Sequence, residues 1–323
     1  MVEKKVLLAD PVSDTALEIM TSAGISVDSK FGLNEDELVK LAPEYDGMVV
    51  RSGVKITKKV LEAGAKGKLK IIGRAGVGVD NIDKDAAKVL GICVENTPFG
   101  NTNAAAEHTI ALMMAISRHI HHAAKSMKEG NWDRKSFEGV ELKGKTLGLI
   151  GFGNVGKKVA RVALGMEMKV IVYDPFITEE KLAEIGVKKA ELAQIYANAD
   201  YITVHVPLTP QTKNMISDKE FGEMKKGVRI LNVARGGVIN EDALLNALDS
   251  GKVAAAGLDV YNEEPPLSRK LIEHKNVTCT PHLGASTFEA QENVALEVAK
   301  QMVLALKNGE IKNCVNGVAK LKN

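Results

Sequence analysis

The chain has 323 residues, of which 45% are hydrophobic and 26% charged, the composition of an ordinary globular protein. At roughly 100 to 200 residues per domain, this length predicts two domains. The 43 basic and 41 acidic residues leave a net charge of +2, so the overall field does not favour a nucleic acid or a membrane surface as partner. Arginine is scarce, with 8 residues against 35 lysines, and the few arginines deserve individual inspection.

The cysteines Cys93, Cys279 and Cys314 are odd in number and widely spaced. They form neither a disulfide framework nor a metal-binding pair, so we expect a reducing cytoplasm. The first residues lack the apolar stretch of a signal peptide, and no run approaches the 18 or so apolar residues of a membrane span.

The first hundred residues alternate short apolar runs with helical patterns. Expected strands are 5–9, 25–27, 47–50, 70–72 and 92–94, and expected helices are 14–23, 34–41 and 83–90. This βαβ succession predicts a parallel, doubly wound sheet.

A turn-like run at 96–100 interrupts the pattern, and one long amphipathic helix is expected over 104–128. A second βαβ series follows, with expected strands at 146–150, 169–173, 201–206, 228–233, 254–259 and 277–280, a helix from about 154 and a last helix over 287–307. The predicted fold class is therefore α/β with two doubly wound parallel sheets.

The segment that follows the strand at 146–150 fits G-x-G-x-x-G, with Gly151, Gly153 and Gly156. In that motif the glycines permit a tight turn and close approach of a pyrophosphate to the backbone. The next strand ends at Asp174, where an acid would accept hydrogen bonds from the adenosine ribose of NAD and repel the 2′-phosphate of NADP. The alternative is that Asp174 simply caps the turn before Pro175.

A second match, GxxxxGK[ST] over 139–146, is interpreted as accidental. A P-loop needs a strand before the glycines and a helix after the Lys-Thr pair, whereas here a strand follows.

Three later strand ends carry Arg235, Glu264 and His282. Oxidation of a 2-hydroxy acid needs a base for the hydroxyl proton, which a histidine oriented by a carboxylate supplies, and a cation for the carboxylate. The alternatives are a solvated pair for Glu263 and Glu264 and a helix-end contact for Arg235.

The other histidines are interpreted as non-catalytic. His108, His119, His121 and His122 are expected on a solvated helix face, and no metal site is expected among them. His205 is placed at a strand end beside the adenosine, and His274 at the surface.

These motifs together resemble the D-isomer-specific 2-hydroxyacid dehydrogenases, and most closely the branch that acts on phosphoglycerate. The resemblance rests on the motifs VVRS at 49–52, GRAGVGVDN at 73–81, NTP at 96–98, the glycine motif, NVARGG at 232–237, LDV at 258–260, EP at 264–265 and PHLGAST at 281–287. The match covers nearly the whole chain.

The resemblance implies a role for each matched residue. Arg235 would bind the substrate carboxylate, Glu264 would partner the histidine, and His282 would be the acid and base. The implied NAD contacts are Val77, Gly151, Gly153, Asn154, Val155, Gly156, Asp174, Val206, Val233, Ala234, Asp259, Gly284 and Ala285, with Asp259 on the nicotinamide side. Arg51, Arg74, Gly76 and, from a partner subunit, Arg134 beside Trp132 would bind the substrate.

The implied function is NAD-dependent oxidation of 3-phospho-D-glycerate to 3-phosphohydroxypyruvate, the first step of serine synthesis. The expected organisation is a substrate domain, flavodoxin-like, of residues 1–98 and 286–323, with a Rossmann NAD-binding domain of residues 99–285 inserted into it. Helix 104–128 and the segment around Trp132 are the expected homodimer surface.

Two alternatives remain: reduction of hydroxypyruvate, glyoxylate or another 2-keto acid, and an NAD-responsive regulator on the same fold. Two departures from the family pattern also bear on function. Residue 154 is Asn where the family often has a basic residue, so we expect backbone amides alone to hold the diphosphate. The chain stops soon after Val315-Asn316-Gly317, so no serine feedback through an amino-acid-sensing domain is expected.

Overall fold

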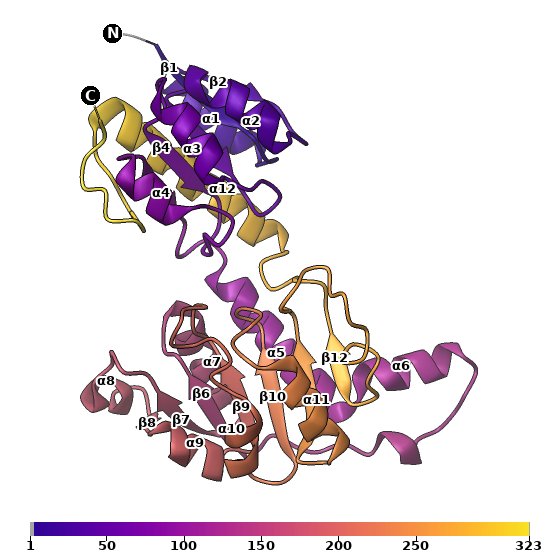
Figure 1. Cartoon of the computed structure of the whole chain (residues 1–323). Coiled ribbons are helices and arrows are strands. Elements are labelled where there is room, and N and C mark those ends of the chain that lie inside the picture. Colours follow the sequence, from indigo (N-terminus) through magenta and orange to yellow (C-terminus); the bar gives the residue numbers. More distant parts are fainter. Residues whose placement is uncertain (1–2, 323) are drawn as a thin grey trace. The chain divides into compact units, whose positions relative to one another are not determined.

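A computed structural model describes residues 3–322 of the chain. The chain divides into two compact units, the first made of Met1–Asn101 with Thr287–Asn323 and the second of Thr102–Ser286 (Figure 1). Among residues 3–322, every helix is too short or too polar to cross a membrane.

The first unit is built on a five-stranded parallel sheet with the strand order β2-β1-β3-β4-β5. Its strands are β1 (Lys4–Leu8), β2 (Ile25–Ser29), β3 (Gly47–Val50), β4 (Ile71–Arg74) and β5 (Cys93–Asn96). This is the flavodoxin-like order, in which the chain reverses direction across the sheet between β1 and β3.

Helices cover both faces of this sheet. They are α1 (Asp14–Ser22), α2 (Glu35–Leu41), α3 (Lys58–Ala65), α4 (Lys84–Val89) and α12 (Phe288–Val303), with the short turns η1 (Ala42–Glu44) and η3 (Leu304–Asn308). Buried side chains of α1 and α12 pack on one face, and those of α2, α3 and α4 pack on the other. The C-terminal helix α12 thereby completes the core that the first hundred residues begin. At α2, Asn34 and Glu37 form a reciprocal capping box, which fixes the start of that helix.

The second unit is built on a seven-stranded parallel sheet with the order β12-β11-β10-β9-β6-β7-β8. Its strands are β6 (Thr146–Ile150), β7 (Lys169–Tyr173), β8 (Lys188–Lys189), β9 (Tyr201–Val204), β10 (Val228–Asn232), β11 (Val253–Leu258) and β12 (Val277–Cys279). The order reverses between β6 and β9, as in dinucleotide-binding folds. The two parallel α/β sheets confirm the predicted fold class.

Helices α5 (Thr102–Arg118) and α7 (Asn154–Gly165) pack on one face of the second sheet, and α9 (Leu192–Asn198), α10 (Asp218–Glu223) and α11 (Glu241–Asp249) pack on the other. The remaining elements are α6 (Ile120–Lys128), α8 (Glu179–Ala183) and η2 (Lys135–Phe137). Strand β6 begins at Thr146, the last residue of the P-loop-like match, so a strand stands where a P-loop requires a helix.

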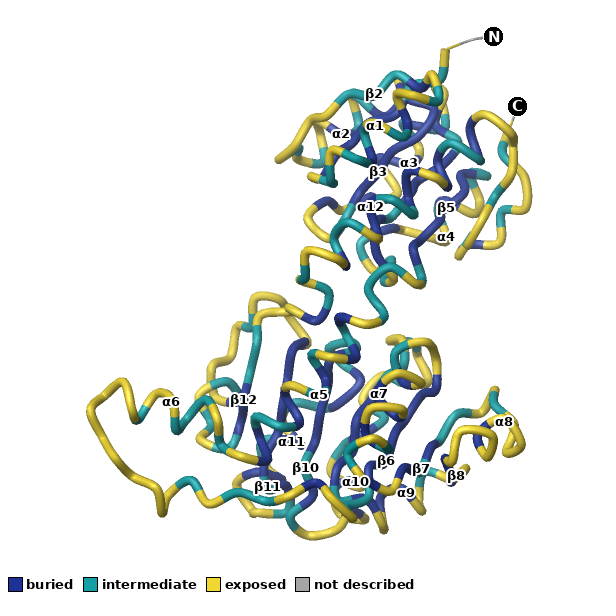
Figure 2. Tube along the Cα trace, turned by 180° about the vertical axis from the view of Figure 1, so that it is seen from behind, coloured by how far each residue is buried: buried dark blue, intermediate teal, exposed yellow. Residues whose placement is uncertain are grey.

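The single helix predicted over 104–128 is wrong, because the structure has two helices, α5 and α6, with a break at His119. His119 has φ 51° and ψ 34°, the left-handed conformation, which no helix can pass through. Helix α6 carries no fully buried residue, and its tube in Figure 2 is teal and yellow, the colours of intermediate and exposed residues. Neither glycine nor proline marks the break, so the periodicity could not reveal it.

The solvated face expected for the helical histidines is also wrong. The Nε2 atom of His108 lies 2.9 Å from Thr280 Oγ1, and the Nδ1 atom of His121 lies 2.9 Å from Thr278 Oγ1, so both rings face β12 and the residue after it. Burial lowers the pKa of His121 to about 4. His274 is not a surface residue either, because its side chain is only 10% exposed.

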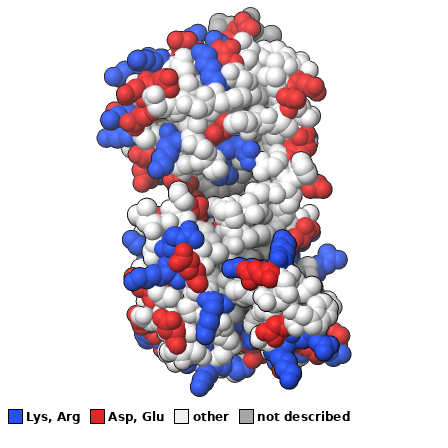
Figure 3. Space-filling view, turned by 90° about the vertical axis from the view of Figure 1, so that its right-hand side faces the viewer, with Lys and Arg blue, Asp and Glu red and all other residues white. Residues whose placement is uncertain are grey.

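Charges of both signs are interspersed on the face shown in Figure 3. Glu95 on β5 is, however, a fully buried acid, with 0% of its surface exposed. One of its carboxylate oxygens accepts a hydrogen bond from the Lys312 amide, whereas Oε2 has no partner among the described residues. Burial raises the pKa of Glu95 to about 7, since low polarity disfavours the charged form.

We expect Glu95→Gln to stabilise the protein at pH 8 and to have little effect near pH 5. A folded-state pKa above the unfolded value means that the folded state binds the extra proton, so wild-type stability falls as the pH rises from about 4.5 to about 7. Glutamine carries no charge to bury, so the free energy of unfolding at pH 8 should rise by on the order of 2 kcal/mol. Urea unfolding at both pH values measures it, and an equal difference at pH 5 and pH 8 would contradict the assignment.

Candidate active site

The glycine turn after β6 lies at the point where the strand order reverses. A Cβ on Gly151 would lie 2.5 Å from the backbone oxygen of His205, which follows β9, and a Cβ on Gly156 would lie 2.4 Å from the backbone oxygen of Gly151. The turn is therefore packed too closely for any side chain at these two positions. By contrast, nothing lies within 4 Å of a Cβ on Gly153.

Helix α7 begins directly after this turn, with Gly153 as its N-cap and no side chain capping it. Backbone amides at such a helix start attract an anion. The close packing at Gly151 and the open space at Gly153 leave room for the pyrophosphate of a dinucleotide beside the exposed Asn154.

Asp174, one residue after β7, holds the same turn from the neighbouring strand end. Its Oδ2 accepts a 2.6 Å hydrogen bond from the Phe152 amide, and its Oδ1 accepts a 2.8 Å bond from the Phe176 amide. The hydrogen bond from the Phe176 amide shows that Asp174 also caps the turn around Pro175, the alternative role considered for it in the sequence. A carboxylate has about four acceptor positions, so both oxygens keep capacity for a ligand.

Arg235 lies in the turn after β10. Its Nη1 donates to the backbone oxygen of Ala234, and its own carbonyl accepts from the Asn232 side chain. The following residue, Gly236, touches the loop after β11: a Cβ there would lie 1.7 Å from the carbonyl oxygen of Tyr261. The arginine turn and the loop that carries Glu264 are therefore in direct backbone contact.

His282 and Glu264, which the sequence predicted as an acid–base unit, are hydrogen-bonded to each other. The His282 Nδ1 atom lies 2.6 Å from Glu264 Oε2, and the side chains are 47% and 38% exposed. Burial alone would raise the pKa of Glu264, but the hydrogen bond and the charge of His282 outweigh it and hold that pKa below its ordinary value. The Tyr261 amide donates to the other carboxylate oxygen, Oε1.

This geometry fixes how the imidazole is protonated. An ionised carboxylate can only accept hydrogen bonds, so Nδ1 of His282 is the donor to Glu264. In the neutral ring Nε2 then carries the lone pair. The pair therefore presents a proton acceptor at Nε2, with a carboxylate behind it to stabilise the charged ring.

Asp259 follows β11 and lies beneath the His282 turn. Its carboxylate is 0% exposed and accepts hydrogen bonds from the amides of Leu283 and Gly284, each 2.7 Å long. The sequence placed Asp259 on the nicotinamide side; the structure shows its oxygens bonded to the protein itself.

In the first unit, Arg51 and Arg74 stand at neighbouring strand ends, since Val50 on β3 pairs with Arg74 on β4. The Arg51 loop is held from two sides. Asp10 Oδ2 accepts the amides of Arg51 and Val54, at 2.7 and 3.2 Å, and Asn81 Nδ2 donates to the carbonyls of the same two residues, at 2.7 and 2.6 Å.

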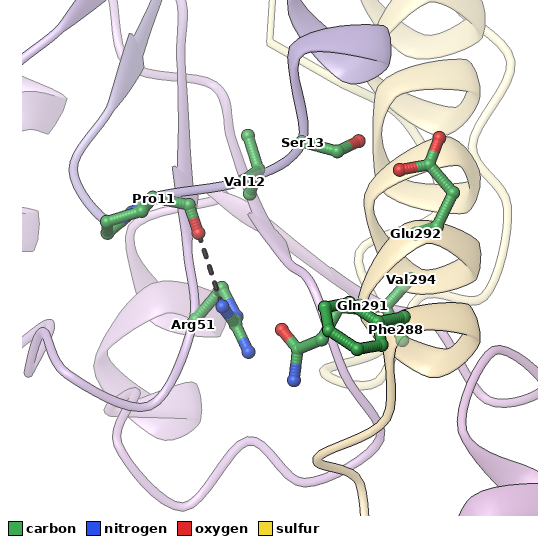
Figure 4. A pocket seen from close by; sticks show the side chains of 8 residues that line it. All are labelled: Pro11, Val12, Ser13, Arg51, Phe288, Gln291, Glu292 and Val294. Carbon is green, nitrogen blue, oxygen red and sulfur yellow. Dashed lines mark hydrogen bonds between the residues drawn. The ribbon is translucent and has the colours of Figure 1, made fainter.

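The Arg51 side chain lines a pocket of about 330 Å³ between the loop after β1 and the start of α12 (Figure 4). Its Nη1 lies 3.4 Å from the carbonyl oxygen of Pro11, and the aromatic ring of Phe288 and the amide of Gln291 face it. Arg74 instead lies across Gly76, where a Cβ would be 1.4 Å from Arg74 Nη1. The Arg74 side chain can take this position only because residue 76 is a glycine.

The remaining predicted residues lie on both units. The first unit carries Gly76, which is buried, and Val77, which is exposed. The second carries the half-buried Val155, Val206, Ala234 and Ala285, the buried Val233 and Gly284, and the exposed Arg134. Arg134 directly precedes the short helix η2.

The sequence analysis did not predict a role in the site for four residues that shape it: Asp10, Asn81, His108 and Thr280. Asp10 could have been found, because it stands just past a strand end, as Asp174 and Asp259 do. The other three are recognised only from their partners in space.

Comparison with known proteins agrees with this architecture. Residues 110–284 match the family model of the D-isomer specific 2-hydroxyacid dehydrogenase, NAD binding domain. The chain belongs to this family, and its cofactor is NAD.

A curated relative is the D-3-phosphoglycerate dehydrogenase of Archaeoglobus fulgidus, 48% identical over 97% of this chain and 59% of that protein. The chain thus spans about three-fifths of the length of this relative.

Two solved structures are also similar to the chain. The glyoxylate reductase of Paecilomyes thermophila has a TM-score of 0.89 and 30% identity, covering 98% of this chain and 99% of that one. The NAD⁺-bound 3-phosphoglycerate dehydrogenase of Entamoeba histolytica has a TM-score of 0.82 and 31% identity, covering 97% and 99%.

We expect Gly236→Ala to separate the arginine turn from the Glu264 loop. The added Cβ would meet the backbone of Tyr261, which cannot rotate away, so the loop must shift. Turnover should fall by about tenfold or more and stability by about 1–3 kcal/mol. Gly222→Ala is the control, because nothing lies within 4 Å of its Cβ. Thermal unfolding and turnover of both variants measure this, and wild-type turnover in Gly236→Ala would rule out the coupling.

Proposed function

We propose that this chain catalyses the NAD-dependent oxidation of 3-phospho-D-glycerate to 3-phosphohydroxypyruvate, the first step of serine synthesis. The observation that carries the proposal is the His282–Glu264 pair, 2.6 Å apart, at the sheet edge that also holds the glycine turn and Arg235. The 48% identity to a D-3-phosphoglycerate dehydrogenase over 97% of the chain supports this choice of substrate.

In the proposed reaction, the substrate loses a proton from its C2 hydroxyl and a hydride from C2. Nε2 of His282 accepts the proton of the C2 hydroxyl, and Glu264 stabilises the imidazolium that forms. Bound NAD supplies the acceptor for the hydride that leaves C2. In the reverse direction, the same imidazolium returns the proton to the oxygen.

Arg235 is the proposed partner of the substrate carboxylate, because a guanidinium can bind both carboxylate oxygens at once. Arg51, Arg74 and the backbone at Gly76 are the proposed partners of the phosphate. Asp10 and Asn81 support this role by holding the Arg51 loop in one conformation.

The proposed cofactor site follows the strand ends of the second unit. The amides around Gly153 and Asn154 would hold the diphosphate, and Asp174 the adenosine ribose. The remaining proposed contacts are Val77, Val155, Val206, Val233, Ala234, Gly284 and Ala285. The proposed domains are a substrate domain of residues 1–98 and 286–323 and an NAD-binding domain of residues 99–285.

We also propose a homodimer formed through α5, α6 and the segment around Trp132. Exposed apolar side chains favour this surface: Trp132 is 75% exposed, and Ile120 and Met127 are also exposed. Arg134, beside Trp132, would then reach the substrate site of the partner subunit. The three free cysteines fit a reducing cytoplasm as the place of the reaction.

The substrate is tested by comparing kcat/KM for 3-phospho-D-glycerate and D-glycerate, following NADH by absorbance. Lost charge-assisted contacts to the phosphate should lower kcat/KM for D-glycerate by about 100-fold or more. Arg51→Ala and Arg74→Ala should lower kcat/KM for the phosphorylated substrate and leave that for D-glycerate nearly unchanged. Equal kcat/KM values for both substrates would contradict the proposal that 3-phospho-D-glycerate is the substrate. A preference for the reduction of glyoxylate or hydroxypyruvate would contradict it as well.

We expect His282→Ala to lower kcat by around 10² to 10⁴ while NADH binding stays intact, as for loss of a general acid and base. Turnover and NADH fluorescence titration measure the two effects separately. Turnover within a few fold of wild type would show that another group takes the proton.

We expect Asp174→Ser to raise the use of NADP relative to NAD by about tenfold or more, because the carboxylate that repels a 2′-phosphate is lost. Serine still offers an oxygen near the Phe152 amide, so the glycine turn should survive. The ratio of kcat/KM values for the two cofactors measures the change. An unaltered ratio would place the ribose contact elsewhere.

A further inference from the structure

The turn that carries His282 has no regular secondary structure, yet three consecutive amides in it are bonded to one residue. The His282 amide donates to the carbonyl oxygen of Asp259 at 2.9 Å, and the amides of Leu283 and Gly284 donate to its Oδ1 and Oδ2 at 2.7 Å each. Asp259 in turn donates its own amide to the Asn232 carbonyl at the end of β10. The turn is thus held to the sheet through Asp259.

The backbone of His282 needs such support. Its φ is 54°, in the left-handed region that residues with a side chain rarely adopt. Conformations of this kind are strained and persist only where the surroundings impose them. The three hydrogen bonds from backbone amides to Asp259 impose the left-handed conformation of His282, and the His282 ring then points at Glu264.

Asp259 is a fully buried carboxylate, so its charge must be compensated by donors. Besides the two amides, Thr280 Oγ1 donates to Asp259 Oδ1 at 2.5 Å, and His108 Nε2 lies 3.3 Å from the same oxygen. Burial would raise the pKa of Asp259, but the hydrogen bonds from His108, Thr280 and the turn amides outweigh it and lower that pKa.

The hydrogen positions in this network follow from the number of protons that each group can donate. A hydroxyl has one proton, and that of Thr280 points to the carboxylate of Asp259, which can only accept. Thr280 Oγ1 must therefore accept from His108 Nε2, 2.9 Å away, so His108 carries a proton on Nε2. His108 lies on α5, far from Thr280 in the sequence, and in the described part of the chain it makes no hydrogen bond to His282.

We infer that His108, Thr280 and Asp259 are positioning residues for His282: His108 orients the Thr280 hydroxyl, both compensate the Asp259 charge, and Asp259 fixes the turn that aims the His282 ring at Glu264. This inference rests on the proposed function only in that His282 is the acid and base. It gives Asp259 a role that needs no contact with the nicotinamide.

Matched threonine variants test the inference, because β12 and the residue after it offer two His–Thr pairs. Thr280→Val removes the hydroxyl that links His108 to Asp259, whereas Thr278→Val removes a hydroxyl that pairs only with His121 and has no path to Asp259. Both substitutions keep the side-chain shape. Thr280→Val should lower kcat by about tenfold or more with KM changed less than threefold, Thr280→Ser should recover most of that loss, and Thr278→Val should leave kcat unchanged.

A measurement without turnover separates this inference from the proposed function. In the apo protein, amide hydrogen exchange at His282, Leu283 and Gly284 should be faster in Thr280→Val and in His108→Leu than in wild type or Thr278→Val. His108→Gln, which keeps a donor, should restore protection.

The outcomes are distinct. Faster exchange together with a wild-type enzyme that fails to oxidise any hydroxy acid would refute the proposed function and leave the network standing. Unchanged exchange and kcat in Thr280→Val, or an equal loss of kcat in Thr278→Val, would refute the inference. Should His108→Leu fail to fold, the threonine pair decides alone.

Discussion

The constraint on which the rest of the structure depends is that every strand pairs in parallel with its neighbours. The carboxyl ends of the strands in each sheet therefore share one edge, and residues far apart in the sequence meet there. The backbones at that edge approach so closely that glycine is required where turns touch, at Gly151 against His205 and at Gly236 against Tyr261. The site is consequently a set of loops that support one another, and each loop depends on its neighbour as much as on its own strand.

Aspartates just past strand ends solve the problem of holding these loops in place. Asp10 follows β1 and accepts amides from the loop after β3, Asp174 follows β7 and accepts the Phe152 amide after β6, and Asp259 follows β11 and accepts amides from the turn after β12. In every case the loop belongs to the adjacent strand. A short acidic side chain is suited to this, since it only accepts hydrogen bonds and its charge strengthens each bond to an amide. The same device thus recurs in both units.

The sequence was sufficient for the features that depend on local pattern. Short apolar runs predicted the strands, and β6 and β7 begin and end where expected, because a strand buried on both faces is apolar throughout. The glycine spacing and the strand-end positions of Arg235, Glu264 and His282 placed the candidate site on one sheet. What the sequence missed depends on contacts across the fold. The left-handed break at His119 carries no glycine or proline, and the histidines of α5 and α6 face β12 because of packing that no periodicity encodes.

Aspartates at strand ends also show why a residue's role is hard to assign from its position alone. Asp174 and Asp259 both stand one residue after a strand, and either position suits a cofactor ligand. Their surroundings differ in one decisive respect. Asp174 is half-buried and accepts hydrogen bonds from two amides, so its oxygens can accept more, whereas Asp259 is fully buried and meets four protein donors. Because a buried carboxylate is stable only when its donors are in place, the network around Asp259 and the conformation of the His282 turn form together. Burial, rather than residue type or position, therefore separates Asp174, the proposed partner of the adenosine ribose, from Asp259, which holds the His282 turn.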